Sequence, residues 1–364
     1  MESDKMNPKV TIDLAKLRHN ARVMTEKCNE YGIAIAGVTK VFGGRPEIAQ
    51  AMIDGGIQYL ADSRVENLKK MKDLSLPKIL LRLPMISRVD DVVKYCDISL
   101  NSEVETIIAL SQAAEKQHKT HKIILMVDLG DLREGIFDSQ ALKLALDEIK
   151  NLKGIKVVGI GTNLTCYGGV IPDEENLGRL IAYASEIEAV LGTKLEIISG
   201  GNSSSIYMVQ EGRMLEEVNL LRLGEAIVLG TESAYGNVIP GTHQDIFQLE
   251  AEIIEIKEKP SIPIGKIGMD AFGNKPSFED KGVRKRAILA VGKQDIGTHA
   301  IRPVNVNVII LGGSSDHLIV DITDCDMQHQ IGSTLTFDLT YGALLSLMTS
   351  EYIYKQMNDT KPRP

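Results

Sequence analysis

The chain has 364 residues, of which 43% are hydrophobic and 25% are charged. These fractions are ordinary for globular proteins and disfavour collagen-like, coiled-coil and disordered classes, and the length suffices for two or three domains. Asp and Glu outnumber Lys and Arg by 49 to 41, for a net charge of −8. Nucleic acid is therefore a disfavoured partner, because phosphate binding needs a clustered positive field.

The beginning of the chain lacks the apolar stretch of an export signal, and the purest apolar run, 123–127, is too short to span a membrane. The four cysteines lie far apart without a Cys-x-x-Cys pair, which predicts reduced thiols rather than disulfides or structural zinc. The histidines show no metal-ligand spacing, so no metal is expected. We therefore expect a soluble, cytoplasmic protein.

Residues 33–229 repeat one unit eight times, in which a short apolar run is followed by a loop and then by helical periodicity. Alternating strands and helices predict parallel strands, and eight units favour a (β/α)8 TIM-like barrel. An open doubly wound sheet is the alternative, but no Gly-x-Gly-x-x-Gly follows the first strand. The expected strands are 33–38, 58–61, 78–82, 98–100, 122–127, 156–161, 195–199 and 220–223.

The two ends of the chain have a different pattern of apolar and polar residues. Residues 10–12 look like a strand, and Asp13 is placed to cap a helix. After about Tyr235 come long alternating runs that predict a C-terminal β-strand domain, with a hairpin connection at 312–316. We expect the barrel at 14–235 and the β domain at 236–364 plus 1–13. The alternating runs are 248–257, 287–291, 304–311, 318–322 and 334–339.

Chemically distinctive residues follow the expected strands, at the end of a barrel where catalytic groups collect. Gly200 to Ser205 join flexible backbone to hydroxyl groups before a helical pattern, which is typical of a phosphate site, and Gly224 would let a second loop approach. A turn with serine caps is the competing interpretation. The other distinctive residues are Lys40, Asp62, Arg64, Asn67, Arg82, Asn101, Arg133, Asn163 and Arg222.

Lys40 follows the first strand among the apolar neighbours Val38, Val41 and Phe42. A lysine in such surroundings is suited to form a Schiff base with a carbonyl compound. A lysine and a phosphate anchor across a barrel mouth are what pyridoxal 5′-phosphate requires.

Four segments resemble the alanine racemase family of fold-type III pyridoxal-phosphate enzymes, most closely its ornithine racemase branch. They are Val-Thr-Lys-Val-Phe-Gly-Gly at 38–44, Val-Asp-Leu-Gly-Asp-Leu-Arg-Glu-Gly at 127–135, Gly-Asn-Ser-Ser at 201–204 and Leu-Arg-Leu-Gly-Glu-Ala at 221–226. The resemblance implies that Lys40 binds the cofactor and that Arg133 lies near its phenolic oxygen and the substrate carboxylate. It also places Asn202, Ser203 and Ser204 at the phosphate.

The resemblance implies that Arg222 contacts the pyridine nitrogen. Because arginine does not readily give up a proton, the cofactor would be a weaker electron sink, which favours racemization over transamination. Two departures from the family stand nearby. Asn163 replaces the histidine that commonly stacks on the cofactor, and Met126 replaces a modified lysine, so no carbamate is expected.

Racemization needs a second proton carrier on the face of Cα opposite Lys40. The family supplies a tyrosine from the partner subunit, but the corresponding segment here, 267–273, has none. Asp270 is our first candidate, with Tyr167 or Cys166 as alternatives, and a turn or capping aspartate is the competing interpretation. The resemblance also places Lys293 and Asp295 near the substrate pocket, and Tyr352 or Tyr354 near the phosphate.

The resemblance implies a pyridoxal-phosphate-dependent amino-acid racemase, an isomerase acting on ornithine or another basic amino acid as a homodimer. Asp270 and Asp295 are compatible with a distal ammonium. Two alternatives remain open: a pyridoxal-phosphate binding and homeostasis protein, which the long C-terminal region disfavours, and a fold-type III decarboxylase.

Overall fold

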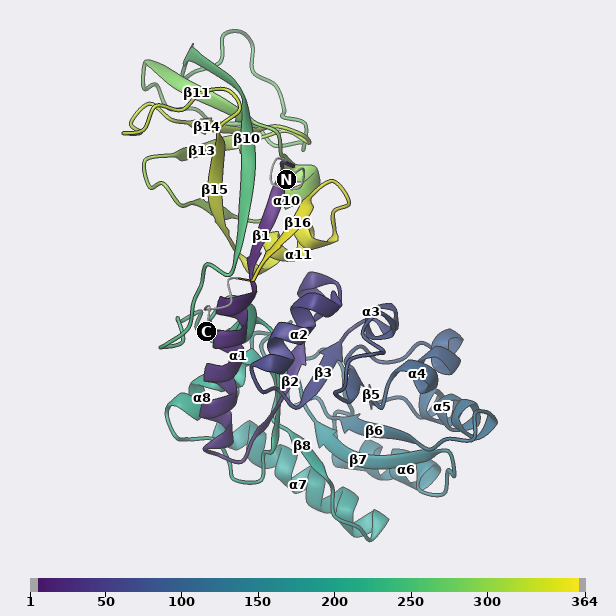
Figure 1. Ribbon diagram of the computed structural model, residues 1–364. Coiled ribbons are helices and arrows are strands. Elements are labelled where there is room, and N and C mark those ends of the chain that lie inside the picture. The colour runs from purple at the N-terminus through teal and green to yellow at the C-terminus, as the bar shows by residue number, and fades with distance from the viewer. Residues whose placement is uncertain (1–5, 360–364) are drawn as a thin grey trace. The chain divides into compact units, whose positions relative to one another are not determined.

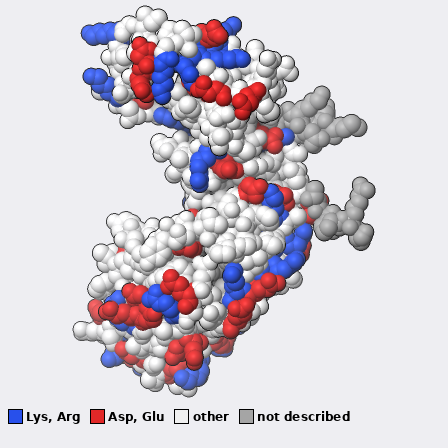
Figure 2. Space-filling model, turned by 90° about the vertical axis from the view of Figure 1, so that its left-hand side faces the viewer, with Lys and Arg blue, Asp and Glu red and all other residues white. Residues whose placement is uncertain are grey.

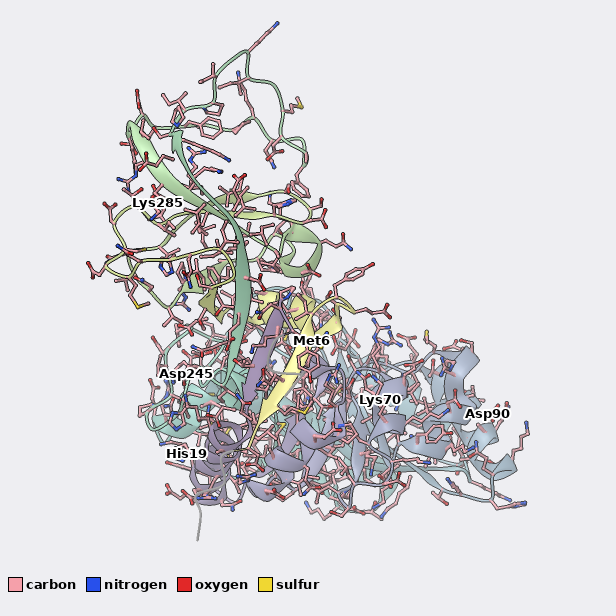
Figure 3. All side chains as sticks on the ribbon, turned by 45° about the horizontal axis from the view of Figure 1, so that its top comes forward. Met6, His19, Lys70, Asp90, Asp245 and Lys285 are labelled. Atoms are coloured by element: carbon pink, nitrogen blue, oxygen red, sulfur yellow. The ribbon has the colours of Figure 1, made fainter. Side chains whose placement is uncertain are left out.

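The computed structural model in Figure 1 describes residues 6–359, which form two compact units. One comprises 15–244, and the other joins the segment up to Leu14 to the segment from Asp245 onward. The division thus falls after Gln244 rather than at the expected 235/236. Residues 236–244 stay with the barrel because Nε2 of His19, which is labelled in Figure 3, lies 2.8 Å from Gly241 O, and Asn20 Nδ2 donates to His243 O at 2.8 Å.

Eight parallel strands close into a barrel in chain order, which confirms the predicted fold class. The barrel is closed where Ala34 to Gly37 pair with Leu220 to Leu223. The strands are β2 (Ala34–Val38), β3 (Tyr59–Asp62), β4 (Lys78–Leu80), β5 (Ile98–Asn101), β6 (His121–Met126), β7 (Ile155–Gly161), β8 (Ile197–Ser199) and β9 (Leu220–Leu223).

Most of the strands are followed by α-helices, as the periodicity predicts. The helix α7 (Glu174–Leu191) shows why: Asp173 and Asn176 form a reciprocal capping box at its start, Gly192 ends it at φ +68°, and its apolar stripe is buried. The other helices are α1 (Leu14–Asn29), α2 (Pro46–Asp54), α3 (Val65–Lys70), α4 (Val89–Tyr95), α5 (Val104–Lys116), α6 (Ser139–Ile149), α8 (Ile206–Gln210) and α9 (Glu225–Val228), with short 3-10 turns η2 (Lys40–Phe42), η3 (Ile86–Arg88) and η4 (Ser203–Ser205).

Side chains from all eight strands form one buried cluster within the barrel unit. It combines small residues such as Ala36 and Ala61 with larger ones such as Ile79, Ile124 and Met126. This close packing makes the strands a rigid base for the loops at their carboxyl ends.

The second unit is rich in antiparallel strands, as expected. Its main sheet has the order β12-β15-β10-β11-β14-β13, and β1 pairs with both β10 and β16. The strands are β1 (Lys9–Asp13), β10 (Phe247–Pro260), β11 (Val283–Leu289), β12 (Ile301–Pro303), β13 (Ile309–Gly313), β14 (Leu318–Asp321), β15 (Thr334–Leu339) and β16 (Tyr354–Asn358), with the helices α10 (Lys293–Ile296) and α11 (Tyr341–Thr349).

The predicted strand 304–311 is wrong in its first half. Asn305 forms a turn there, because its side chain accepts from Asn307 N at 3.0 Å and its carbonyl accepts from Val308 N at 3.1 Å. Only Ile309 onward is extended. The hairpin after it is confirmed, since β13 and β14 are antiparallel and Ser314 N donates to His317 O.

Figure 2 shows basic and acidic side chains interspersed on the face in view rather than separated by sign. Within residues 6–359, no helix combines the length and apolar character needed to cross a bilayer.

Candidate active site

Lys40 begins the turn η2 one residue after β2, and a buried carboxylate binds the side chain of that intervening residue, Thr39. Asp62, at the end of β3, has an exposed fraction of 0%. It accepts from Thr39 Oγ1 at 2.6 Å, from Arg64 N at 2.9 Å and from Asn67 Nδ2 at 3.1 Å. Burial raises the pKa of Asp62, while these hydrogen bonds and the charge of Lys40 act in the opposite direction.

The loop after Lys40 is held from the neighbouring helix α3. A Cβ on Gly44 (φ +61°) would lie 2.6 Å from Asn67 Cβ, so only glycine allows this approach. Lys70, labelled in Figure 3, donates to Gly43 O at 2.9 Å and to Asn67 Oδ1 at 3.1 Å. A second carboxyl group, that of Glu225, interacts electrostatically with Lys40. Burial raises the pKa of Glu225, and the charge of Lys40 acts in the opposite direction.

Arg222, the third residue of β9, joins three adjacent strands at the barrel mouth. Its guanidinium donates to Ser199 Oγ of β8 and, at 2.7 Å, to Thr162 O after β7. Burial lowers its pKa to about 10, against the opposing effect of Glu134 and Cys166, and Arg133 adds to the lowering. The two arginines predicted for the site therefore lie close enough to interact.

The Gly-Asn-Ser loop after β8 is bound to the loop after β7 through Asn202. Asn202 Oδ1 accepts from Ser204 N at 2.8 Å, whereas Nδ2 donates to Asn163 Oδ1 at 3.2 Å and to Leu164 O at 2.9 Å. Cys166 Sγ lies 3.5 Å from the same Nδ2.

The same loop also reaches the end of β9. Ser203 Oγ accepts from Ala226 N at 3.1 Å. A Cβ on Gly224 would lie only 3.2 Å from Val38 Cβ, next to the Lys40 segment. The structure thus brings the loops that carry Asn163, Asn202 and Ser203 into contact with one another and with the end of β9.

Three buried polar atoms in this region have no hydrogen-bond partner within the described part of the chain: Thr162 Oγ1, Asn163 Nδ2 and Ser204 Oγ. A buried polar group left in this condition costs about 1–3 kcal/mol, so such atoms indicate a polar ligand. The Ser204 hydroxyl could bind a phosphate group, and the Lys40 amine could form a Schiff base with an aldehyde. The site therefore fits pyridoxal phosphate.

Arg133 lies in the loop after β6 and donates through Nε and Nη2 to the carboxylate of Glu134. Burial tends to lower the pKa of Arg133, but the bonds and charge of Glu134 outweigh it and raise the pKa. Sequence reasoning did not select Glu134, which accepts from the Arg133 guanidinium, or the buried Asp131, which accepts backbone N–H groups, because nothing in the sequence distinguishes such loop carboxylates from solvated ones.

The remaining candidates belong to the strand-rich unit. Asp270 closes a turn: its Oδ1 accepts from Phe272 N at 2.9 Å and from Asn274 N at 2.8 Å, and these bonds lower its pKa. These are the contacts expected from the turn interpretation. A role for Asp270 as a base stays a prediction.

Lys293, Asp295 and Tyr352 have other contacts within that unit. Lys293 Nζ lies 4.0 Å from the centroid of the Phe272 ring. Asp295 is buried and accepts from Ser350 Oγ at 2.7 Å, and the same Oγ accepts from Tyr352 N at 3.2 Å. The Tyr352 side chain is exposed. The roles predicted for these residues, and the one for the half-buried Tyr354, stay predictions.

The model of the alanine racemase N-terminal domain matches residues 12–232, more than half of the chain. The chain belongs to the alanine racemase family. Two family relatives resemble it over most of its length. Ornithine racemase of Acetoanaerobium sticklandii is 51% identical over 97% of this chain and 100% of its own, and lysine racemase of Thermotoga maritima is 41% identical over 96% and 98%.

The fold of the family extends over the whole chain. The crystal structure of alanine racemase from Bartonella henselae with covalently bound pyridoxal phosphate has a TM-score of 0.73, covers 97% of this chain and 100% of its own, and is 20% identical. This likeness concerns the fold alone.

Proposed function

We propose that this chain is a pyridoxal-phosphate-dependent racemase of ornithine or another basic amino acid. The observation that carries the proposal is the barrel mouth itself: Lys40 lies on one strand end, and a hydroxyl-rich loop containing the unpartnered Ser204 Oγ lies on another. The similarity to ornithine and lysine racemases supports the reaction and the choice of a basic substrate.

Each barrel residue receives a role in this proposal. Asn202, Ser203, Ser204 and Gly224 would hold the cofactor phosphate, Asn163 would face the ring, and Arg222 would contact the ring nitrogen. When bound, the cofactor supplies an electron sink that makes the Cα proton of an amino acid removable. Arg222 is a hydrogen-bond donor held by Ser199 Oγ and Thr162 O, so its guanidinium stays fixed while protons move elsewhere.

Lys40 would take and return the Cα proton on one face. The buried carboxylate of Asp62 holds the preceding residue, Thr39, which limits the movement of the lysine segment. Arg133 would bind the substrate carboxylate, for which a planar guanidinium offers two parallel donors. Glu134 occupies the Nε and Nη2 side of the guanidinium in this structure, so the substrate carboxylate would bind the edge formed by Nη1 and Nη2.

The proton carrier for the opposite face has three candidates, and the contacts favour Cys166. Its thiol is exposed and touches Asn202 of the phosphate loop. Tyr167 is also exposed, and it is bound to Asp131 through its backbone N rather than through its phenol. Asp270 Oδ1 already accepts two backbone N–H groups of its own turn. Its carboxylate could pair with the distal ammonium of a basic substrate.

The decisive test replaces Lys40 with alanine and compares the variant with Lys143→Ala, which removes an exposed surface lysine. We expect Lys40→Ala to lose both the visible absorbance of bound cofactor and the interconversion of L- and D-ornithine, with both retained in the control. Turnover by Lys40→Ala would overturn the proposal, as would faster racemization of alanine than of ornithine. Carbon dioxide release would instead identify a decarboxylase, and bound cofactor without turnover a homeostasis protein.

We also propose that the protein acts as a cytoplasmic homodimer. The four thiols are free, as expected in a reducing compartment. Sedimentation of the holoenzyme tests the oligomeric state, and a fully active monomer would contradict the dimer.

A further inference from the structure

The loop after β7, 162–170, has no regular secondary structure, although it carries Asn163 and Cys166. Thr165 within it has φ +74°, a left-handed conformation that is strained for a β-branched residue. Such a conformation persists only where the surroundings impose it. The loop therefore needs anchors outside itself.

Asp131, in the neighbouring loop after β6, provides the main anchor. Its carboxylate is fully buried and accepts three backbone N–H groups of the loop. Oδ1 accepts from Thr165 N at 3.0 Å and from Val170 N at 3.1 Å, and Oδ2 accepts from Tyr167 N at 3.0 Å. Hydrogen bonds to a charged acceptor are about twice as strong as neutral ones, so this carboxylate ties both ends of the turn.

The two loops also touch through their backbones. A Cβ on Gly168 would lie 2.6 Å from Asp131 O, so the loop cannot approach this closely with any larger residue at 168. Thr165 Oγ1 closes the turn from within by donating to Val170 O at 3.0 Å. Asp131 thus contacts the 162–170 loop through its side-chain carboxylate and also through its backbone carbonyl.

On its other side, the loop is attached to the phosphate loop by Asn202. Asn163, with its unpartnered buried Nδ2, and Cys166 therefore lie between two fixed points, Asp131 and Asn202. Asp131 also stands two residues before Arg133. One carboxylate consequently fixes the geometry of two loops that carry site residues.

We infer that Asp131 is a positioning residue, which holds the 162–170 loop so that Asn163 and Cys166 face the cofactor. The inference rests on the proposed function. It requires that loss of the Asp131 carboxylate alter the loop first and the chemistry as a consequence.

Asp131→Asn tests this with minimal change of shape, because it places an NH2 group opposite one of the three N–H donors. Asp138→Asn is the matched control, since Asp138 caps α6 through Ala141 N at 2.8 Å and asparagine caps helices equally well. Hydrogen exchange of the 162–170 segment, measured without cofactor, should be about tenfold faster or more in Asp131→Asn and unchanged in Asp138→Asn.

In the holoenzyme, we expect kcat for ornithine to fall by on the order of 100-fold in Asp131→Asn with little change in KM, and the cofactor absorbance to shift. Unchanged exchange would overturn the inference, and so would faster exchange with wild-type kcat and absorbance. Should Asp131→Asn not fold, Gly168→Ala tests whether the contact of the loop with Asp131 controls the chemistry, because its Cβ would push the loop away from Asp131 O. Wild-type exchange, kcat and absorbance in Gly168→Ala would then overturn the inference. Absence of racemization in the wild type would refute the proposed function, while the exchange comparison would still decide whether Asp131 holds the loop.

Discussion

Replacement of Gly201 by alanine is a direct test of the phosphate loop, because the backbone there excludes a side chain. Gly201 has φ +113°, and a Cβ would lie 2.6 Å from Ser205 Oγ. The backbone strain costs about 1–3 kcal/mol. Ser205 is fully buried and donates to Gly200 O at 2.7 Å, so moving its hydroxyl leaves a buried carbonyl unpaired at a further cost of about 1–3 kcal/mol.

Gly178→Ala is the matched control, since it makes the same chemical change but should raise the stability of the protein instead of lowering it. Gly178 lies inside α7, and nothing is within 4 Å of its added Cβ. Alanine there should stabilise the helix by about 0.5–1 kcal/mol. The two variants should therefore differ in the free energy of unfolding by about 3 kcal/mol or more, with Gly201→Ala the less stable.

Urea unfolding of the cofactor-free protein, followed by circular dichroism, measures this difference. Titration with pyridoxal phosphate then reports on the loop, because a distorted cradle weakens binding by about tenfold for each 1.4 kcal/mol. Equal stability of the two variants would refute the account of the Gly201 backbone. A destabilised Gly201→Ala that binds the cofactor normally would remove this loop from the phosphate site.

Two further predictions concern protons. Burial lowers the pKa of His121, which contacts Ser99 Oγ at 2.8 Å, to about 4, so the unfolded chain binds more protons than the folded one between about pH 6.5 and 4. Stability should fall by about 3 kcal/mol as pH drops through that window, and His121→Gln should flatten the curve of unfolding free energy against pH. Cys166→Ala should slow solvent-deuterium incorporation from one ornithine enantiomer more than from the other, whereas equal slowing, or the asymmetry in Asp270→Asn instead, would remove Cys166 as the second base.

The barrel strands were predictable because burial on both faces demands short apolar runs, and all eight runs occur where the sequence places them. The first half of 304–311 was predicted wrongly as a strand, because its alternating valines are typical of a strand although Asn305 forms a turn there. The helix α11 and the strand β16 were also absent from the prediction. The apolar face of α11 is short, and β16 owes its pairing to β1, a partner at the far end of the chain.

The site was predictable to the extent that it depends on residue type. Lys40 and the Gly-Asn-Ser loop follow strands, and Arg222 lies near the end of β9, so barrel geometry places all of them at the carboxyl ends of strands. Asp62 and Asp131 act through backbone N–H groups and hydroxyls whose positions depend on the folded loops. Such partners appear only once the loops are built, which is why sequence reasoning listed Asp62 without a role and missed Asp131.

The pairing of β1 with β16 has a consequence for synthesis on the ribosome. During synthesis β1 emerges before the barrel, yet the parallel neighbour of β1 starts at Tyr354, after the entire barrel has emerged. Folding during translation proceeds domain by domain, so the barrel can fold while β1 still has an unpaired edge. Chaperone capture or premature association of nascent chains would therefore act on this waiting edge.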